Sequence, residues 1–474
     1  MKKEILSVGI DIGTTTTSMI VSKLGMQNTA ASHMVPEINI TKKEIIYRSE
    51  LYQTPLKTRE VLDGEKIRQI IEKEYRNAGI TPEMVDTGAV IITGESSLKE
   101  NAQIVVDSIS SLAGEFVVAT AGPDLESILA GRGSGAEEFS KKYGCIAANL
   151  DIGGGTTNIS VFDCGALVGQ TCLDVGGRIM KYDESGIISY VSPRLNDLCA
   201  LRGIRFEEGS RISDDELLEV GLLLAQTIFD SINLEHTELT QIATTRTSSP
   251  LNIKEQIEYI SFSGGVSDCY YSDENNLRRF FDLGPAIAKS LQKQKIFESY
   301  EIVEPKETIR ATVVGAGTYM TEVSGSTISY NENVFPIKNL PMYKANEQEE
   351  MDLYLGQSER LQKGLRWYID QSQEERIGIC IKGKEMASYK ELCNMAAALL
   401  DLDAAVLNHE YPLVIICEND LAKALGLVIG RINKERTIIC LDRVSVRSGD
   451  YIDIGAPVMD GVALPVVVKT LIFS

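Results

Sequence analysis

A Gly-rich segment occurs twice in this chain, and the repeat restricts the fold more than any other feature of the sequence. Residues 10–21 read IDIGTTTTSMIV and residues 150–161 read LDIGGGTTNISV, so that six of the twelve aligned positions are identical. Each copy lies between apolar runs, which predicts a strand, a tight Gly-rich turn and a second strand. A repeat of this kind indicates two similar structural units in one chain.

Each copy carries a carboxylate followed by groups that can surround a phosphate. Glycine lets the backbone approach a ligand closely, and successive N–H groups with Thr hydroxyls form a concave site for phosphate oxygens. Asp11 and Asp151 stand where the first strand of each copy ends, which suits a carboxylate that holds hydrated Mg²⁺ or orients a water molecule. The candidate phosphate-binding residues of the two turns are Gly13, Thr14, Thr15, Gly153, Gly154, Gly155 and Thr156.

The alternative interpretation is that each copy is an ordinary β-hairpin turn with an Asp before it. This alternative has to hold twice at equivalent places. We therefore favour two turns that face each other across a cleft and clamp a polyphosphate from both sides. A further Gly-rich turn, at Gly176 and Gly177, follows the predicted strand Gly165–Leu173 and adds candidate phosphate contacts to the second unit.

A third Gly-rich loop fits the nucleoside end of such a ligand. The apolar run Ile257–Phe262 predicts a strand that leads into Ser263, Gly264 and Gly265. Two residues without side chains leave bare backbone against which a purine or a ribose can lie. An isolated loop of this kind indicates little, but after two phosphate turns it supports a nucleotide site.

Two other glycine clusters are interpreted as structural. A predicted helix from Pro123 to about Ala130 is followed by Gly131–Gly135, which we interpret as a helix C-cap and hinge. It is not interpreted as a dinucleotide site, because it follows a helix rather than a strand. Gly315 and Gly317 lie in a helix predicted to begin near Thr308, and small residues at this spacing suit a helix that crosses another closely.

Length and composition bound the classes of protein that fit. The chain has 474 residues, which corresponds to roughly three domains of typical size. A net charge of -20 argues against nucleic-acid or anionic-membrane partners, because both bind basic surfaces. Nine Cys without a CxxC spacing, and three His far apart, predict a reducing compartment with neither disulfides nor a zinc site. Asp11 interrupts the first apolar run too early for a signal peptide, and no apolar run has the length of a membrane span.

The last part of the chain, from about residue 331, alternates predicted helices with predicted strands and therefore predicts a separate small α/β domain. Its first predicted helix covers Glu347–Tyr368. Gly378–Lys384 matches the pattern GxxxxGK, but Glu385 replaces the required Ser or Thr and the segment reads as a strand. We therefore do not interpret it as a P-loop. The predicted domains are residues 1–142, 143–330 and 331–474.

The order of these motifs resembles the actin/Hsp70/sugar-kinase superfamily over roughly residues 5–325. Its phosphate 1, connect 1, phosphate 2, adenosine and connect 2 motifs match residues 11–15, 119–130, 151–157, 263–265 and the helix of Gly315 and Gly317. The resemblance implies two ribonuclease-H-like α/β lobes with ATP and Mg²⁺ in the cleft between them. It also implies that Asp11 and Asp151 lie near the hydrated Mg²⁺, with Asp151 orienting the attacking water.

Two departures from the superfamily pattern bear on turnover. Asn158 stands where Hsp70-like proteins carry a second Asp, and Gly122-Pro123 stands where they carry a Glu-Pro pair. Asp124 and Glu126 are the candidates to replace that connector carboxylate. We therefore expect slow Mg²⁺-dependent ATP hydrolysis, as in a molecular switch, rather than fast metabolic flux.

Nearly the full length, including the third domain, resembles the family of ethanolamine ammonia-lyase reactivating factors. The similarity rests on residues 7–16, 261–266, 452–457 and 465–470. It implies a chaperone that uses ATP to release damaged cobalamin from an adenosylcobalamin-dependent lyase, so that intact cofactor can bind. The lyase is then the protein partner and cobalamin is handled through it, while homo-oligomerisation stays open. The implied location is the cytoplasm, beside or within a bacterial microcompartment.

Two other functions stay open at this point. A small-molecule kinase of the same superfamily, acting on a sugar or a carboxylate, needs a substrate pocket and a general base near the γ-phosphate, and no sequence feature identifies either. A filament module of the cytoskeletal type favours a membrane-tethering tail, and Ile472–Ser474 is too short for one. We expect the third domain to dock on the protein partner, because the two lobes already account for the nucleotide.

Overall fold

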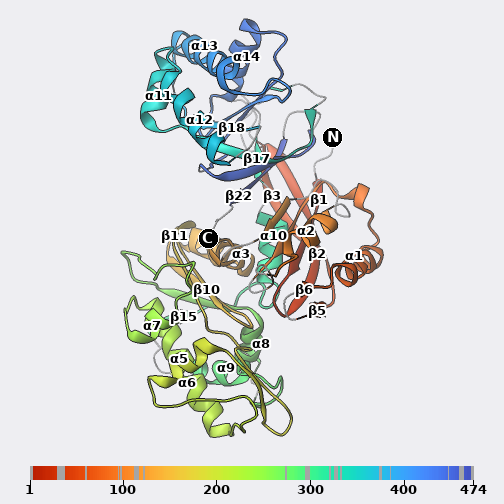
Figure 1. The fold of residues 1–474 in the computed structure, drawn as a ribbon, viewed down its shortest axis with the longest axis vertical. Helices are drawn as coiled ribbons and strands as arrows, with labels where there is room; N and C mark the ends of the chain where they lie inside the picture. The colour runs from red at the N-terminus through yellow and green to blue at the C-terminus, as the bar shows by residue number, and fades with distance from the viewer. Residues whose placement is uncertain are drawn as a thin grey trace.

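Three large sheets organise the computed structural model of this chain, and each sheet belongs to its own α/β unit (Figure 1). The structure describes residues 4–28, 38–58, 61–93, 96, 99–110, 117–120, 123–272, 275–293, 299–319, 322–324, 329–330, 334–372, 376–384, 386–446, 448–457 and 464–470.

The unit that we name the first lobe holds the earlier copy of the repeat at the end of its central strand. Its sheet has the order β3-β2-β1-β7-β8, in which β1, β2 and β3 are antiparallel neighbours and β7 and β8 run parallel to β1. Helices α1 and α2 form the crossovers of the parallel part. The elements are β1 (Glu4–Ile12), β2 (Thr16–Asn28), β3 (Ile38–Arg48), β4 (Tyr52–Gln53), β5 (Leu56–Thr58), β6 (Val61–Leu62), α1 (Gly64–Ala78), η1 (Pro82–Met84), β7 (Thr87–Ile92), α2 (Ala102–Ser110) and β8 (Val117–Thr120).

The second lobe repeats this topology around the later copy. Its sheet has the order β11-β10-β9-β14-β15, with β9, β10 and β11 antiparallel and with β14 and β15 parallel to β9. The predicted fold class, two α/β lobes of like topology followed by a further α/β unit, is confirmed. The elements are α3 (Pro123–Ser134), α4 (Ala136–Tyr143), β9 (Ile146–Ile152), β10 (Thr157–Asp163), β11 (Ala166–Leu173), β12 (Met180–Tyr182), β13 (Ile188–Val191), α5 (Pro193–Ala200), α6 (Asp214–Ile232), α7 (Glu238–Ala243), β14 (Tyr259–Ser263), α8 (Gly265–Tyr271), α9 (Gly284–Lys293), β15 (Glu301–Ile302) and α10 (Ala311–Tyr319).

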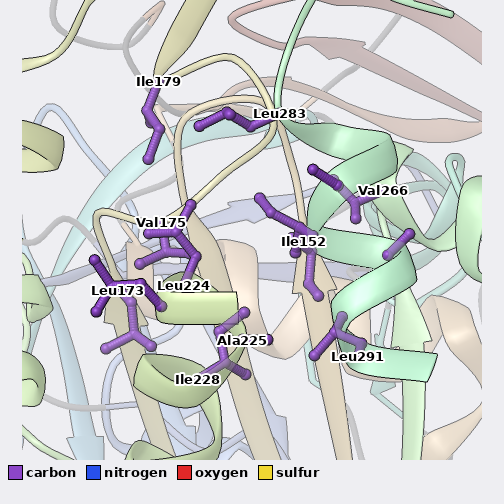
Figure 2. Close-up of a cluster of buried hydrophobic side chains, with 14 of the residues drawn as sticks. Ile152, Leu173, Val175, Ile179, Leu224, Ala225, Ile228, Val266, Leu283 and Leu291 are labelled. Atoms are coloured by element: carbon purple, nitrogen blue, oxygen red, sulfur yellow. The ribbon is translucent and has the colours of Figure 1, made fainter. Parts of the chain in front are cut away.

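The core of the second lobe joins the elements that border the later Gly-rich turn. Ile152 at the end of β9, Val266 of α8 and Leu283 before α9 belong to one buried cluster (Figure 2). Val175 and Ile179, on either side of the Gly176–Gly177 turn, belong to the same cluster. Because the turn glycines have no side chains to bury, these close-packed neighbours set the position of the turns.

Helices α3 and α10 cross in direct backbone contact between the two lobes. A Cβ atom at Gly133 would lie 1.8 Å from the carbonyl oxygen of Ala311, and one at Gly315 would lie 2.0 Å from that of Leu129. Helix α10 also packs on β1, where a Cβ atom at Gly317 would lie 3.0 Å from a backbone nitrogen. Only glycine fits these contacts, so the predicted close helix crossing is confirmed.

The predicted helix C-cap at Gly131–Gly135 was wrong, because α3 continues to Ser134. Gly131 and Gly133 lie inside the helix, where they serve close packing rather than termination. A Cβ atom at Gly131 would lie 2.2 Å from Ser160 Oγ of β10. Only at Gly135, between α3 and α4, does the backbone take a left-handed conformation, with φ of 91°.

The third domain is built on a seven-stranded sheet of order β16-β22-β21-β17-β18-β19-β20, in which β17 to β20 are parallel. The predicted single helix Glu347–Tyr368 was wrong, because it is two helices, α11 and α12, separated at Gly356 with φ of 81°. The elements are β16 (Glu322–Ser324), β17 (Ile337–Lys344), α11 (Glu347–Tyr354), α12 (Glu359–Ser372), β18 (Gly378–Ile381), α13 (Tyr389–Val406), β19 (Leu413–Cys417), α14 (Ala422–Ile432), β20 (Ile438–Asp442), β21 (Asp450–Ile454) and β22 (Leu464–Thr470).

The third domain contacts the first lobe through two of its strands. Strand β16 follows directly on α10, pairs with β22 and contacts β3, while β22 itself contacts β8. Figure 1 shows the third domain next to the first lobe and the second lobe on the opposite side of α3 and α10.

All nine cysteines have free thiols, and seven of them are buried. Burial raises the pKa of the Cys199 thiol to about 11 and that of Cys440 to about 12, so that these thiols stay protonated and unreactive at neutral pH. Within the described ranges, no helix is both long enough and apolar enough to cross a membrane.

The crossing of α3 and α10 predicts the effect of a single methyl group. Gly315→Ala is expected to lower the free energy of unfolding by about 1–3 kcal/mol, because its Cβ overlaps a backbone carbonyl that has no room to move. Gly430→Ala is the matched control, since its Cβ would have no neighbour closer than 4.0 Å in helix α14. Urea unfolding followed by circular dichroism measures both variants. Equal stability of the two variants would contradict the crossing.

Candidate functional site

The two copies of the repeat fold into the same turn. In the first lobe the Gly13 N–H donates to the carbonyl oxygen of Thr16, and in the second the Gly153 N–H donates to that of Thr156, both at 2.9 Å. Asp11 pairs with Ser18 across the first hairpin, at the position where Asp151 pairs with its own neighbour across the second. The equal register therefore places each carboxylate two residues before the first glycine of its turn.

The two turns lie against each other across the boundary between the lobes. A Cβ atom at Gly154 would lie 2.8 Å from Thr15 Oγ1, so the first turn reaches the backbone of the second. A Cβ atom at Gly155 would have no neighbour within 4 Å, which leaves that part of the second turn open. The arrangement brings together the backbone N–H groups and hydroxyls that a polyphosphate needs.

The Gly176–Gly177 turn packs against the backbone of the Gly153–Gly155 turn. The Gly177 N–H donates to the carbonyl oxygen of Gly153 at 2.9 Å. A Cβ atom at Gly176 would lie 2.5 Å from the carbonyl oxygen of Gly154. The two glycines therefore act by close backbone packing, and the predicted direct contact with phosphate stays a prediction.

Arg178 is a candidate site residue that sequence reasoning passed over. Its N–H donates to the carbonyl oxygen of Gly154 at 2.6 Å, and its Nε lies 3.5 Å from Asp282 Oδ2. Burial raises the pKa of Asp282 to about 6, while the Gly284 N–H and the Arg178 charge lower it. An Arg directly after the two glycines of a turn is the sequence signal that could have identified it.

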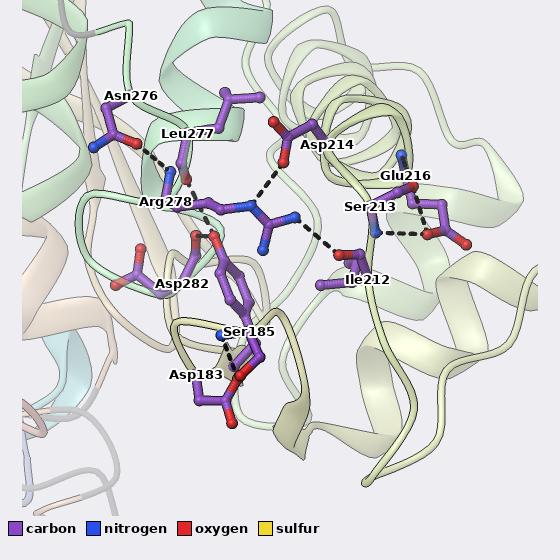
Figure 3. Close-up of polar contacts among 11 residues, drawn as sticks. Asp183, Ser185, Ile212, Ser213, Asp214, Glu216, Asn276, Leu277, Arg278 and Asp282 are labelled. Carbon is purple, nitrogen blue, oxygen red and sulfur yellow. Dashed lines mark hydrogen bonds and ion pairs between the residues drawn. The ribbon is translucent and has the colours of Figure 1, made fainter.

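The loop that carries Asp282 is anchored from the other side. Arg278 Nε donates to Asp214 Oδ1 at 2.7 Å and a terminal nitrogen of the same guanidinium donates to the Ile212 carbonyl oxygen at 2.9 Å (Figure 3). The Tyr182 hydroxyl donates to the Asp282 carbonyl oxygen at 3.1 Å. These bonds hold Asp282 beside Arg178 at the start of α9.

The predicted nucleoside loop lies beside the end of β9. Gly264 has φ of 83°, and a Cβ atom there would lie 2.4 Å from the carbonyl oxygen of Ile152. The first neighbour of a Cβ atom at Gly265 would be 3.9 Å away, so this backbone is open to a flat ring. The side chain of Ser263 is buried and its hydroxyl donates to Asp151 Oδ1 at 2.6 Å, so this residue contacts the carboxylate.

Both candidate carboxylates hold a proton more strongly than an exposed Asp. Burial raises the pKa of Asp11 to about 7, the Thr93 hydroxyl at 3.0 Å lowers it and the charge of Asp151 raises it again. Burial raises the pKa of Asp151 to about 6, and the hydrogen bond from Ser263 lowers it. The charge of Asp151 disfavours ionisation of Asp11, and two buried carboxylates in this relation form an environment that attracts a cation.

The donor set at the turns fits Mg²⁺ better than a metal that needs a protein cage. In the described part of the chain, no three His, Cys, Asp or Glu side chains gather closely enough to hold a metal ion together. Mg²⁺ is commonly held by one or two carboxylates, with phosphate oxygens and waters completing its six ligands. Asp11 and Asp151 are suited to that arrangement.

Asn158 is buried directly opposite Asp151 in the β9–β10 register. Its Oδ1 atom has no hydrogen-bond partner among the described residues. An Asp at this position would place a further negative charge beside a carboxylate whose pKa burial already raises. The amide therefore avoids that repulsion, and the structure gives the departure from the superfamily pattern a physical reason.

The predicted connector carboxylate falls on the segment that leads into α3. Gly122 and the side chain of Asp124 lie outside the described residues, and Glu126 lies partly buried on α3. Replacement of the connector Glu by Asp124 or Glu126 stays a prediction.

The sequence profile of the family described as "Ethanolamine utilisation protein EutA" matches residues 3–474. This chain belongs to that family. It is 35% identical over 474 residues to the "Ethanolamine ammonia-lyase reactivase EutA" of Escherichia coli (strain K12), and the match covers 99% of both chains. It is 36% identical over 472 residues to the protein of the same name from Salmonella typhimurium, again over 99% of both chains.

Solved structures resemble the chain only in part. The Aquifex aeolicus Ppx/GppA enzyme is 13% identical, and the match covers 66% of this chain and 99% of that chain with a TM-score of 0.40. The ethanolamine utilization protein EutJ from Carboxydothermus hydrogenoformans is 16% identical, with 66% and 89% of the two chains covered and a TM-score of 0.30.

The carboxylates predict how stability depends on pH. The unfolded Asp11 ionises near its ordinary value of 3.8, whereas the folded group keeps its proton to a pKa of about 7. The folded state binds more protons between these values, so the stability of the nucleotide-free protein falls as pH rises through that window. The advantage of Asp11→Asn over the wild type in melting temperature is therefore expected to be larger at pH 8 than at pH 5, because pH 5 lies near the beginning of that window and pH 8 beyond its end.

Differential scanning fluorimetry at the two pH values measures this difference. Asp197→Asn, an exposed change on α5, is the control that leaves the pH dependence as in the wild type. Equal melting temperatures of the wild type and Asp11→Asn at pH 8 would contradict a free-energy cost of ionising the buried carboxyl group.

Proposed function

We propose that this chain is an ATP-dependent reactivase for ethanolamine ammonia-lyase. The observation that carries the proposal is the identity of 35% and 36% to two proteins named as reactivases of that enzyme, over 99% of each chain. The two matching Gly-rich turns, each with a carboxylate before it, supply the reason for ATP. The activity is accordingly a slow ATP hydrolysis that serves a chaperone role.

The residues at the lobe boundary divide the work between them. Gly13, Thr14 and Thr15 hold the phosphate chain from the first lobe, and Gly153 to Thr156 hold it from the second. Bare backbone at Gly264 and Gly265 receives the adenosine. Asp11 and Asp151 hold Mg²⁺, which neutralises charge on the phosphates when bound. Asp151, fixed by Ser263, accepts a hydrogen bond from the attacking water and so orients it.

Nucleotide binding draws the two turns together, and the lobes rotate about the crossing of α3 and α10. Because the third domain contacts the first lobe through β16 and β22, this rotation moves it relative to the second lobe. A lyase held by the third domain is thereby strained open, damaged cobalamin leaves it, and intact cofactor enters. The proposed domains are residues 1–142 and 143–330 for the lobes and 331–474 for docking, at a cytoplasmic location associated with a microcompartment.

Recovery of lyase activity tests this function. Inactivated ethanolamine ammonia-lyase that retains damaged cobalamin is mixed with this protein, ATP, Mg²⁺ and adenosylcobalamin, and deaminase activity is followed. Recovery is expected with ATP and absent without it. Active lyase is the control for the assay, and a lack of recovery in its presence would refute the proposal.

Asp151 separates nucleotide binding from hydrolysis. Asp151→Asn is expected still to bind Mg·ATP, because Asp11 and both Gly-rich turns remain, and to hydrolyse it at least about 100-fold more slowly, because the amide does not accept a proton. Calorimetry and phosphate release measure the two properties. Asp163→Asn, at the far end of the same hairpin, is the control with wild-type turnover. Unchanged hydrolysis in Asp151→Asn would remove Asp151 from this role.

Exposed apolar side chains on the third domain test the docking role. Met351 and Leu355 lie one helical turn apart at α11, with 61% and 69% of their surface exposed. Met351→Glu combined with Leu355→Glu is expected to weaken lyase binding by about tenfold or more while ATP hydrolysis stays unchanged. Ile104→Glu, an equally exposed position on α2 of the first lobe, is the matched control. Equal lyase affinity for both variants would place the docking surface elsewhere.

A further inference from the structure

The second lobe contains a cavity of about 220 Å³ at the opposite end of its sheet from Asp151. Helix α4, the first residues of β9 and β14, and the segment 303–306 before α10 surround it. Its position is therefore next to both connections between the lobes, and no residue of the nucleotide site lines it.

Three aromatic residues, Phe139, Tyr143 and Tyr259, line the cavity together with four charged residues, Glu138, Lys142, Glu304 and Lys306. The ring of Phe139 lies 4.6 Å from that of Tyr143 and 5.1 Å from that of Tyr259, measured between ring centres. Ala147 and Ser261, which are both buried, also line the cavity. For comparison, an apolar cavity of roughly 150 Å³ accommodates benzene. The volume and the walls therefore suit a planar group of one or two rings.

The register of β9 and β14 connects this cavity to the nucleotide site along one face of the sheet. Alternate residues of a strand share a face, and three successive pairs on this face lead from the cavity to the cleft. They are Tyr259 with Ala147, Ser261 with Asn149, and Ser263 with Asp151. The first pair lines the cavity and the last contains the candidate catalytic carboxylate.

The side chains of these pairs form an unbroken chain of hydrogen bonds. Ser261 Oγ donates to Asn149 Oδ1 at 2.9 Å, and Asn149 Nδ2 donates to Ser263 Oγ at 2.8 Å. Ser263 Oγ then donates to Asp151 Oδ1 at 2.6 Å. Every donor points toward Asp151, and aligned hydrogen bonds in a buried setting strengthen one another.

The four side chains joined by these hydrogen bonds are all buried. Asn149 and Ser263 are completely buried, and Ser261 and Asp151 are each 5% exposed. A buried polar side chain is costly unless it is fully bonded, so the loss of one partner is felt by the next. An apolar pair in place of Ser261 and Asn149 would fill the same space in the core without depending on hydrogen bonds. Packing alone therefore does not require continuous hydrogen bonding from Ser261 to Asp151.

We propose that this cavity is a regulatory site for a small planar aromatic molecule with a hydrogen-bonding group, and that its occupancy alters Asp151 through Ser261, Asn149 and Ser263. A bound ring places its polar atom at the Ser261 hydroxyl. The bound molecule thereby weakens or strengthens the hydrogen bond from Ser261 to Asn149. The change is passed through Ser263 to the carboxylate of Asp151, which orients water. The effect on hydrolysis rests on the proposed function, whereas binding to the cavity does not.

Indole is the probe, because its two fused rings match the cavity and its N–H can donate to Ser261. Saturation-transfer NMR without nucleotide is expected to detect indole on the wild type and on Ser261→Ala. Ala147→Leu, which fills the cavity, is expected to abolish the signal. Absence of binding to the wild type, or undiminished binding to Ala147→Leu, would overturn the site.

Coupling is then measured as ATP turnover with and without saturating indole. In the wild type kcat is expected to change by about fivefold, the lower end of typical coupling between sites, with KM for ATP unchanged. Ser261→Thr, which keeps the hydroxyl, retains the response and Ser261→Ala loses it. Ser160→Ala is the control, because Ser160 lies buried on the same face of the sheet and outside the chain of bonds.

The outcomes separate this inference from the proposed function. An equal response to indole in the wild type and in Ser261→Ala would overturn the coupling. A wild type that does not hydrolyse ATP would contradict the proposed function alone, and the coupling is then decided by NMR of the Asn149 side-chain amide. Indole is expected to shift that amide resonance in the wild type and not in Ser261→Ala, and an equal shift in both would overturn the coupling.

Discussion

The backbone contact between α3 and α10 is the constraint on which the site depends. Helix α3 covers the face of the second sheet that carries Asp151, and α10 packs on β1, which carries Asp11. The crossing therefore sets how far apart the two sheets lie, and with it the approach of Thr15 to Gly154. Glycines at 133 and 315 are the physical means, since any side chain there meets a backbone carbonyl.

The closeness that this crossing imposes has an electrostatic consequence. Asp11 and Asp151 are brought together in a buried setting, and burial raises the pKa of both carboxyl groups above the usual range. Each accepts a hydrogen bond from a hydroxyl, that of Thr93 for Asp11 and that of Ser263 for Asp151, and a hydroxyl orients the carboxylate without neutralising it. In the proposed function, bound Mg²⁺ would stabilise the ionised form of these two carboxyl groups, which burial disfavours.

Several features were predictable from the sequence because their causes are local. The paired turns follow from the spacing of Asp, Gly and Thr within a dozen residues, and the small residues of α10 indicated a close crossing. The same local rules misplaced the end of α3, because Gly131 and Gly133 read as a cap. Their actual neighbours, Ser160 and Ala311, are remote in sequence, and no cap rule includes them. The break of α11 and α12 at Gly356 was missed because the surrounding polar residues continue a helical pattern.

The sequence by itself determined the fold class and the two matching Gly-rich turns with an Asp before each, since these depend on a short run of residues and on its repetition. Tertiary structure alone decided which groups surround those carboxylates. Arg178 meets Asp282, Asn158 lies opposite Asp151, and Ser261 reaches Asp151 through Asn149 and Ser263. The reason is physical: hydrogen bonds and burial depend on distances across sheets and between lobes, and strand pairing brings together residues that lie more than a hundred positions apart.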